Sequence, residues 1–305
     1  MINLGYACIN TKLSGLPKSK RITTNRTMIK RTFQQKGIKY ASELALANVR
    51  DLKKIIQWNE DHNIKFYRMS SEMFPWASEY NIEDLPDFEK IARIMGEAGD
   101  LANKYGQRLT THPGPFNKLA SPKERVVLAT ITDLEIHGKM MDLLKQPRSP
   151  WAKINIHVGA AYGDKPMALG NFNRNFERLS DAVKTRLTVE NDDKKSLYST
   201  KELYEEVYQK IGTPIVFDYH HHKFCDGDLR EQDALALALS TWGQTKPVVH
   251  YSQSRCKEHN DNKIRENAHS DSYWTPFNPH GFIFDCMLEA KHKEQALFKM
   301  RQLLT

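Results

Sequence analysis

Residues 187–192 read LTVEND, residues 214–221 read PIVFDYHH and residues 247–252 read PVVHYS. Each is a short apolar run that ends in acidic or imidazole side chains, and such runs predict buried strands. Five further runs of this kind lie at 2–9, 65–69, 108–112, 154–158 and 282–288. The segments between them space apolar residues as helices with one buried face do. Eight strands alternating with helices predict an α/β fold, a single (β/α)8 TIM barrel over residues 1–305.

The alternative α/β architecture is a doubly wound open sheet. Its nucleotide-binding fingerprints, GxGxxG and GxxxxGK[ST], do not occur in the sequence, so we expect no nucleotide cofactor. No apolar run approaches the roughly 18 residues of a membrane span. The sequence does not open with a basic and then apolar stretch, and its 4 cysteines form no CxxC. We therefore expect a cytoplasmic protein in reducing surroundings, without disulfides or a thiolate zinc site.

The charge balance favours an anionic partner. The chain has 45 Lys and Arg against 37 Asp and Glu, a formal net charge of +8, and nucleic acid is the first candidate. A polar insertion at 10–27 follows the first predicted strand and carries Lys18, Lys20 and Arg21. Arg255 follows the seventh predicted strand. In a barrel these cations would lie at the carboxyl-terminal rim, where we expect them to contact phosphates.

Acidic and imidazole side chains occur where nearly every predicted strand ends. That end of the barrel is where barrel enzymes build their active sites. Four carboxylates at one barrel mouth would repel each other, and we see no basic residues alternating with them on the strands. Divalent cations would compensate this charge. The predicted ligands are Glu79, His112, His157, Glu190, Asp218, His221, His250, His269 and Glu289.

The number of ions follows from charge. Two divalent ions would already be neutralised by four carboxylates, whereas three would leave positive charge for a hydroxide and a phosphate. Nitrogen and oxygen ligands suit Mn²⁺ or Zn²⁺. Such centres hydrolyse phosphate esters, and we expect Glu190, Glu289 and His112 to be essential for catalysis.

The sequence also resembles the UV damage endonucleases, which are related in fold to the endonuclease IV apurinic-site nucleases. The matching stretches follow one another along nearly the whole chain. They include LGYACIN at 4–10, THPGPF at 111–116, INIHVGAAYGDK at 154–165, LTVENDDK at 187–194, VFDYHH at 216–221, AHSDSY at 268–273 and MLEAKHKEQAL at 287–297.

The resemblance implies a barrel with three divalent ions, Mn²⁺ in preference to Zn²⁺. It implies incision of double-stranded DNA immediately 5′ to UV photoproducts, leaving a 3′-hydroxyl, by an enzyme that associates with the nucleoid. The family's ligand positions fall on the predicted ones from His112 to Glu289. Tyr6 and Asn10 follow the first predicted strand at the rim, where we expect both to contact DNA. For Tyr6 the resemblance implies this role, and a place in the core is the alternative. We expect Tyr6 to assist lesion sensing.

The sequence departs from the family at four positions. Relatives carry His where this chain has Glu79, and often Lys where it has Val248, so we expect no lysine beside the metals. Relatives tend to have Gln and an aromatic residue where this chain has Pro115 and Phe116. We expect this apolar pair to contact DNA, with Phe116 acting as a wedge between base steps.

Two other functions remain open at this point. A sugar or sugar-phosphate isomerase would share the barrel and a carboxylate and histidine site, but would not need a basic rim. A DNA-binding module without catalytic activity would not need nine inward-facing ligands.

Overall fold

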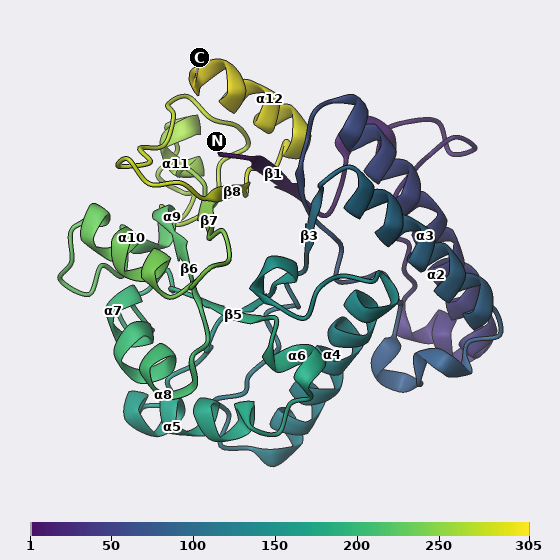
Figure 1. The fold of residues 1–305 in the computed structure, drawn as a ribbon, viewed down its shortest axis with the longest axis horizontal. Helices are drawn as coiled ribbons and strands as arrows, with labels where there is room; N and C mark the ends of the chain where they lie inside the picture. Colours follow the sequence, from purple (N-terminus) through teal and green to yellow (C-terminus); the bar gives the residue numbers. More distant parts are fainter. Residues whose placement is uncertain (1, 305) are drawn as a thin grey trace.

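The computed structural model describes residues 2–304 and shows a closed barrel of eight parallel strands (Figure 1). Met1 and Thr305, the ends of the predicted range, lie outside the described residues. Neighbouring strands follow the order β3-β2-β1-β8-β7-β6-β5-β4. The strands are β1 (Leu4–Ala7), β2 (Phe66–Arg68), β3 (Arg108–Thr110), β4 (Ile154–Ile156), β5 (Leu187–Glu190), β6 (Ile215–Asp218), β7 (Val248–Tyr251) and β8 (Asp285–Leu288).

The barrel closes between β3 and β4 through Thr111. Its amide donates to the Lys153 carbonyl at 3.0 Å, and its carbonyl accepts from the Asn155 amide at 3.0 Å. The predicted barrel is therefore confirmed, with each of the eight predicted strands in its place. Most observed strands are shorter than predicted, by one to three residues at an end.

Helices surround the strands as an outer layer (Figure 1). The helical spacing of apolar residues predicted between the first three strands is found in α2 and α3, which bury one face each. The α-helices are α1 (Thr11–Ser14), α2 (Lys30–Asp61), α3 (Phe88–Lys104), α4 (Glu124–Leu143), α5 (Lys165–Phe176), α6 (Asp181–Lys184), α7 (Thr200–Leu203), α8 (Gln209–Ile211), α9 (Tyr219–His222), α10 (Glu231–Ser240), α11 (Arg255–His259) and α12 (Lys293–Leu304). Within residues 2–304, no helix is long and apolar enough to cross a membrane.

A buried ion pair closes the amino-terminal end of the barrel. Arg108 begins β3 and Asp285 begins β8, and their side chains approach to 3.2 Å with almost no exposure. Lys246 adds a second cation at 2.5 Å from Asp285, and the Arg108 guanidinium lies over the rings of Trp151 and Trp242. Barrel enzymes carry their chemistry at the opposite end, so these paired charges serve the stability of the barrel.

Close packing of the helical layer leads to a test of the fold. A Cβ added to Gly99 of α3 would lie 1.8 Å from the Leu144 carbonyl oxygen, whereas one added to Gly170 of α5 meets nothing within 4 Å. Gly99→Ala should therefore lower the free energy of unfolding by about 3 kcal/mol. The same change at Gly170 should raise it by about 0.5–1 kcal/mol, because alanine favours a helix. Denaturant unfolding of both variants measures this, and equal effects would contradict the packing.

Candidate metal centre at the barrel mouth

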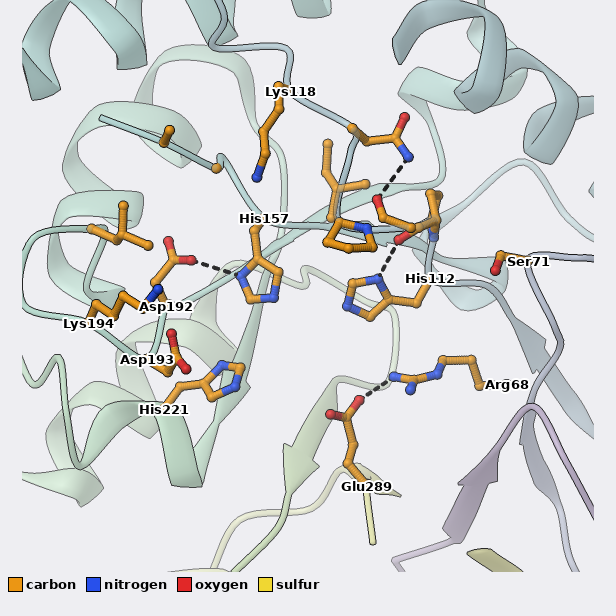
Figure 2. Close-up of a pocket in the computed structure, with 18 of the residues that line it drawn as sticks. Arg68, Ser71, His112, Lys118, His157, Asp192, Asp193, Lys194, His221 and Glu289 are labelled. Carbon is orange, nitrogen blue, oxygen red and sulfur yellow. Dashed lines mark hydrogen bonds and ion pairs between the residues drawn. The ribbon is translucent and has the colours of Figure 1, made fainter. Parts of the chain in front are cut away.

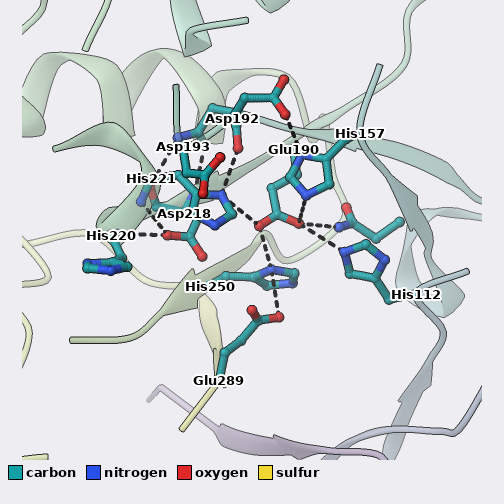
Figure 3. Close-up of polar contacts among 12 residues, drawn as sticks. His112, His157, Glu190, Asp192, Asp193, Asp218, His220, His221, His250 and Glu289 are labelled. Carbon is teal, nitrogen blue, oxygen red and sulfur yellow. Dashed lines mark hydrogen bonds and ion pairs between the residues drawn. The ribbon is translucent and has the colours of Figure 1, made fainter. Parts of the chain in front are cut away.

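The Glu190 carboxylate is the centre of the site. It ends β5, is 1% exposed, and is surrounded by imidazoles from four other parts of the barrel (Figure 3). One carboxylate oxygen lies 3.3 Å from His112 Nε2 and 3.7 Å from His157 Nε2. The other lies 3.1 Å from His250 Nδ1 and 3.4 Å from His221 Nδ1. Side chains far apart in sequence thus converge on one buried anion.

A second carboxylate, Asp218, is placed by the end of β6. Its Oδ1 accepts the backbone N–H groups of His220 and His221 at 2.7 and 2.8 Å and so caps the short helix α9. Its Oδ2 is buried and has no hydrogen-bond partner among the described residues. A buried carboxylate oxygen without a donor is costly, so this atom is suited to a cation. The Nδ1 of His221 lies 2.9 Å from the Asn191 carbonyl, which orients the ring.

A third carboxylate, Glu289, follows β8 on the other side of the mouth. It lies 3.3 Å from His250 Nδ1 and 3.4 Å from His269 Nδ1, and it pairs with the Arg68 guanidinium. His269 reaches the site on the long segment between β7 and β8, where it bridges to Ser254. Three of the predicted ligands, His250, His269 and Glu289, therefore meet here although they belong to different segments.

These side chains form three overlapping sets whose ligand atoms lie within 4.8 Å of one another. They are His112, His157 and Glu190; Glu190, Asp218 and His221; and Asp218, His250 and Glu289. Imidazole nitrogen and carboxylate oxygen are ligands of Mn²⁺ and Zn²⁺. The orphaned Asp218 Oδ2 and the shared carboxylates show that the residues present fit divalent cations.

The pKa values of the metal-free cluster also suit the binding of divalent cations. Burial alone would raise the pKa of Glu190, but His250 and His157 hold it well below its usual range. Burial acts against a charged His157, yet Glu190 and Asp192 raise the pKa of this ring to about 10. Burial lowers the pKa of His112 to about 4, so that ring is neutral and available as a ligand.

Of the nine predicted ligands, the structure brings together the eight from His112 to Glu289. Glu79 is not among them. It ends a 3-10 turn at Ala77–Glu79, and its side chain is exposed. The left-handed backbone of Trp76 starts this turn. The structure therefore does not bring Glu79 into the cluster, and its role as a ligand stays a prediction.

The expectation that no basic residue accompanies the acids is also wrong. Arg68 pairs with Glu289 within the mouth. Lys153 is fully buried, and its Nζ lies 3.1 Å from His250 Nε2. Val248, two residues before His250, is apolar as expected. The lysine that reaches the His250 ring is Lys153, which directly precedes β4.

Sequence reasoning missed two further polar side chains of the site. Asp192 Oδ1 lies 3.2 Å from His157 Nδ1. Asn155 donates from Nδ2 to Glu190 at 2.6 Å and accepts from Thr188 through its side-chain oxygen. The signal for both was strand alternation: Asn155 lies two residues before His157, and Asp192 lies two residues after Glu190. Each therefore continues the inward face of a strand that carries a predicted ligand.

The site opens into a cavity of about 780 Å³ (Figure 2). His112, His157, His221 and Glu289 line its base, and Pro115 lies on its wall. The two lysines on its lining are Lys118 and Lys194.

The predicted DNA contacts divide into three groups. Phe116 is 87% exposed beside the cavity, and Lys18, Lys20 and Arg21 are exposed as expected. Arg255 is half-buried, with its Nε 3.2 Å from Asp271. Tyr6 and Asn10 do not reach the surface, because the Tyr6 hydroxyl bonds to Asn59 and Asn10 inside the barrel wall. A DNA contact by these two residues is not supported.

The raised pKa of His157 leads to a stability test in EDTA. An unfolded histidine titrates near about 6.5. The ion pairs of His157 therefore stabilise the metal-free fold fully below that pH, and this stabilisation is lost as the pH rises through about 10. The thermal midpoint should fall over this range, and it should fall less in His157→Asn. The exposed His292→Asn is the control and should follow the parent. Equal slopes in the parent and His157→Asn would contradict the assignment.

Comparison with known proteins shows the family of this chain. The model of the UV-endonuclease UvdE family matches residues 2–305. The UV-damage endonuclease of Schizosaccharomyces pombe is 37% identical over 97% of this chain and 50% of its own. The UV DNA damage endonuclease of Bacillus cereus is 31% identical over 98% of this chain and 93% of its own.

Among solved structures, the crystal structure of SacUVDE superimposes with a TM-score of 0.82 at 28% identity, over 100% of this chain and 98% of that chain. The present chain spans about half the length of the Schizosaccharomyces pombe and Neurospora crassa relatives. The family match nevertheless extends from the first strand to the last helix. The chain belongs to the UvdE family of UV endonucleases.

Proposed function

We propose that this protein is a metal-dependent endonuclease that cuts the DNA backbone immediately 5′ to UV photoproducts and leaves a 3′-hydroxyl. The observation that carries the proposal is the convergence of eight imidazole and carboxylate ligands on a cavity open to solvent. The names of the relatives, UV-damage endonuclease and UV DNA damage endonuclease, support the substrate. The nick position and the 3′ product follow from the family resemblance.

Divalent cations bound by this ligand set would activate water and stabilise charge on the leaving oxygen. Three overlapping ligand sets support three ions, with Mn²⁺ preferred and Zn²⁺ the alternative. The protein's own contribution is orientation. Asn155 fixes the Glu190 carboxylate and Arg68 fixes that of Glu289. Asp192 holds the His157 ring, as carboxylates beside metal-binding histidines do.

Lesion recognition is proposed for the turn that follows His112. Duplex DNA is too wide to enter a barrel mouth, so the damaged nucleotides must leave the stack. Asn117 donates to the Gly114 carbonyl at 3.0 Å and to Asp133 at 2.7 Å, which fixes the base of the turn. Phe116 is exposed on this turn next to the cavity. Its ring can fill the gap in the stack, but it has no group that reads bases through hydrogen bonds.

The two rival functions are separated by one assay. An isomerase would not nick DNA, and a binding module would bind without nicking. We expect irradiated supercoiled plasmid to be nicked with Mn²⁺, and expect neither nicking in EDTA nor nicking of unirradiated plasmid. A protein that leaves irradiated plasmid intact under all these conditions is not the endonuclease proposed here.

Removing the central carboxylate should abolish this activity. Glu190→Gln should lower the amount of bound metal and reduce incision by about 10³-fold or more. The reason is that the cations held by this carboxylate would supply the electrostatic stabilisation of the reacting phosphate. The matched control is Glu79→Gln, which lies outside the cluster and should keep metal content and activity. Elemental analysis and nicking rates measure both. Normal incision by Glu190→Gln, or loss in Glu79→Gln alone, would place the site elsewhere.

Removing the wedge should affect damage discrimination without affecting the metals. Phe116→Ala should lose about 1–3 kcal/mol of binding to a duplex with one defined lesion, the usual worth of stacking on a base. Binding to the intact duplex and metal content should not change. Ile283→Ala, which removes another exposed apolar side chain, is the control. Undiminished discrimination by Phe116→Ala would show that the wedge is a different residue.

A further inference from the structure

A half-buried lysine stands in the wall of the catalytic cavity without a counter-ion. Lys118 follows Phe116 and Asn117 on the segment between β3 and α4, and its side chain extends into the cavity in the direction of His157 (Figure 2). Among the described residues, no carboxylate lies within 4.0 Å of its Nζ, and its ammonium group has no hydrogen bond. Arg68 and Arg255, by contrast, each have an acidic partner.

The protein holds this lysine in place from both ends. The Lys118 amide donates to Thr130 Oγ1 of α4 at 2.8 Å, which anchors its backbone. Its side chain crosses the β4–α5 loop over Gly159, where an added Cβ would lie 2.5 Å from Lys118 Cδ and 3.0 Å from Nζ. Gly159 has a φ of +101°, so this position favours glycine on backbone grounds as well. The loop therefore leaves a channel in which the lysine stem rests.

The acid whose charge acts on Lys118, Asp192, already has other partners. Asp192 directs Oδ1 to His157 and accepts the Tyr198 amide with Oδ2 at 3.4 Å. Burial lowers the pKa of Lys118, which shows that the neighbouring charges do not compensate for the water it has lost. Lys194, exposed on the loop after β5, lines the same cavity and adds a second positive charge. Asp193 lines the cavity as well, but it accepts the Asn267 side-chain amide, as Asp192 contacts His157. Lys118 and Lys194 are therefore the charged groups of this wall that are left to receive an anion.

We propose that Lys118 binds a non-bridging oxygen of a backbone phosphate next to the one that is cut, with Lys194 supporting it from the rim. The inference rests on the proposed function and adds a phosphate-binding subsite to it. The reacting phosphate must lie over Glu190 and its imidazoles, whereas Lys118 lies on the wall beyond His157. The contact made by Lys118 is therefore equally strong in the bound substrate and in the transition state. It affects the binding of DNA more than the rate of the chemical step.

The test compares Lys118→Met with Lys299→Met, which removes an exposed lysine from the outer face of α12. Binding to one duplex with a defined lesion and to its intact counterpart is measured in EDTA from about 50 to about 200 mM salt. Lys118→Met should bind both about tenfold more weakly, as expected for the loss of a charged hydrogen bond. Its slope of log affinity against log salt should flatten by about 0.9. Lys299→Met should match the parent.

Three further measurements distinguish a phosphate contact from a structural role. Lys118→Arg should retain the salt slope, because it keeps the charge. Inorganic phosphate should raise the thermal midpoint of the parent more than that of Lys118→Met. With Mn²⁺ present, Lys118→Met should show a raised KM and a kcat close to that of the parent. An unchanged salt slope in Lys118→Met, or a fall in kcat at constant KM, would overturn the proposal.

Failure of this inference can be told apart from failure of the proposed function. If the parent protein nicks irradiated DNA and Lys118→Met keeps its salt slope, only the phosphate subsite is wrong. If the parent does not nick DNA under any condition, the endonuclease proposal fails. The binding measurements in EDTA then still show whether Lys118 contacts phosphate.

Discussion

The burial of one carboxylate governs the architecture of the mouth. Glu190 is withdrawn from water at the end of β5, and an isolated buried carboxylate would cost several kcal/mol. Four imidazoles and the Asn155 amide lie around it because each compensates part of that cost. The second carboxylate, Asp218, uses one oxygen to cap α9, and this turn positions His221 against Glu190. The ligand geometry is therefore set largely by the ends of strands and the residues that directly follow them.

The two ends of the barrel use charge differently. At the amino-terminal end, Arg108, Lys246 and Asp285 form a closed arrangement in which the acid is paired with both cations. At the carboxyl-terminal end, the buried oxygen of Asp218 remains without a donor among residues 2–304. In a stabilising ion pair every charged group has a partner within the protein. A binding site, in contrast, must keep some charged or hydrogen-bonding atoms without such a partner, so that a ligand can take that place. This difference identifies the functional end without reference to any relative.

Most of the fold and most of the site could be predicted from the sequence. All strands of a parallel barrel have their carboxyl ends at the same mouth, so residues at those ends come together even when they are far apart in the sequence. Strand periodicity therefore placed His112, His157 and Glu190 together before their contacts were known. Glu79 does not lie among the other ligands and Tyr6 does not lie at the exposed rim, and both differences have local causes. Glu79 follows a left-handed turn that strand spacing does not detect, and Tyr6 lies on a strand face that packs into the barrel wall. Lys153 was missed although it shares the inward face of β4 with Asn155 and His157, because no acid marked that position.

The two unexpected cations change the argument for metals. Arg68 and Lys153 already reduce the repulsion among the carboxylates, so repulsion alone does not require three ions. Counting carboxylates is a weak guide to the number of metal ions. Asp192 is an acid of the site that the sequence argument did not count, whereas Glu79 was counted and lies outside the cluster. Geometry is the stronger guide, because Glu190 and Asp218 each belong to two ligand sets and could bridge neighbouring ions. The cations then have a different purpose: they keep Glu289 and His250 oriented when the ions are absent, so that the site does not have to be reorganised to bind them.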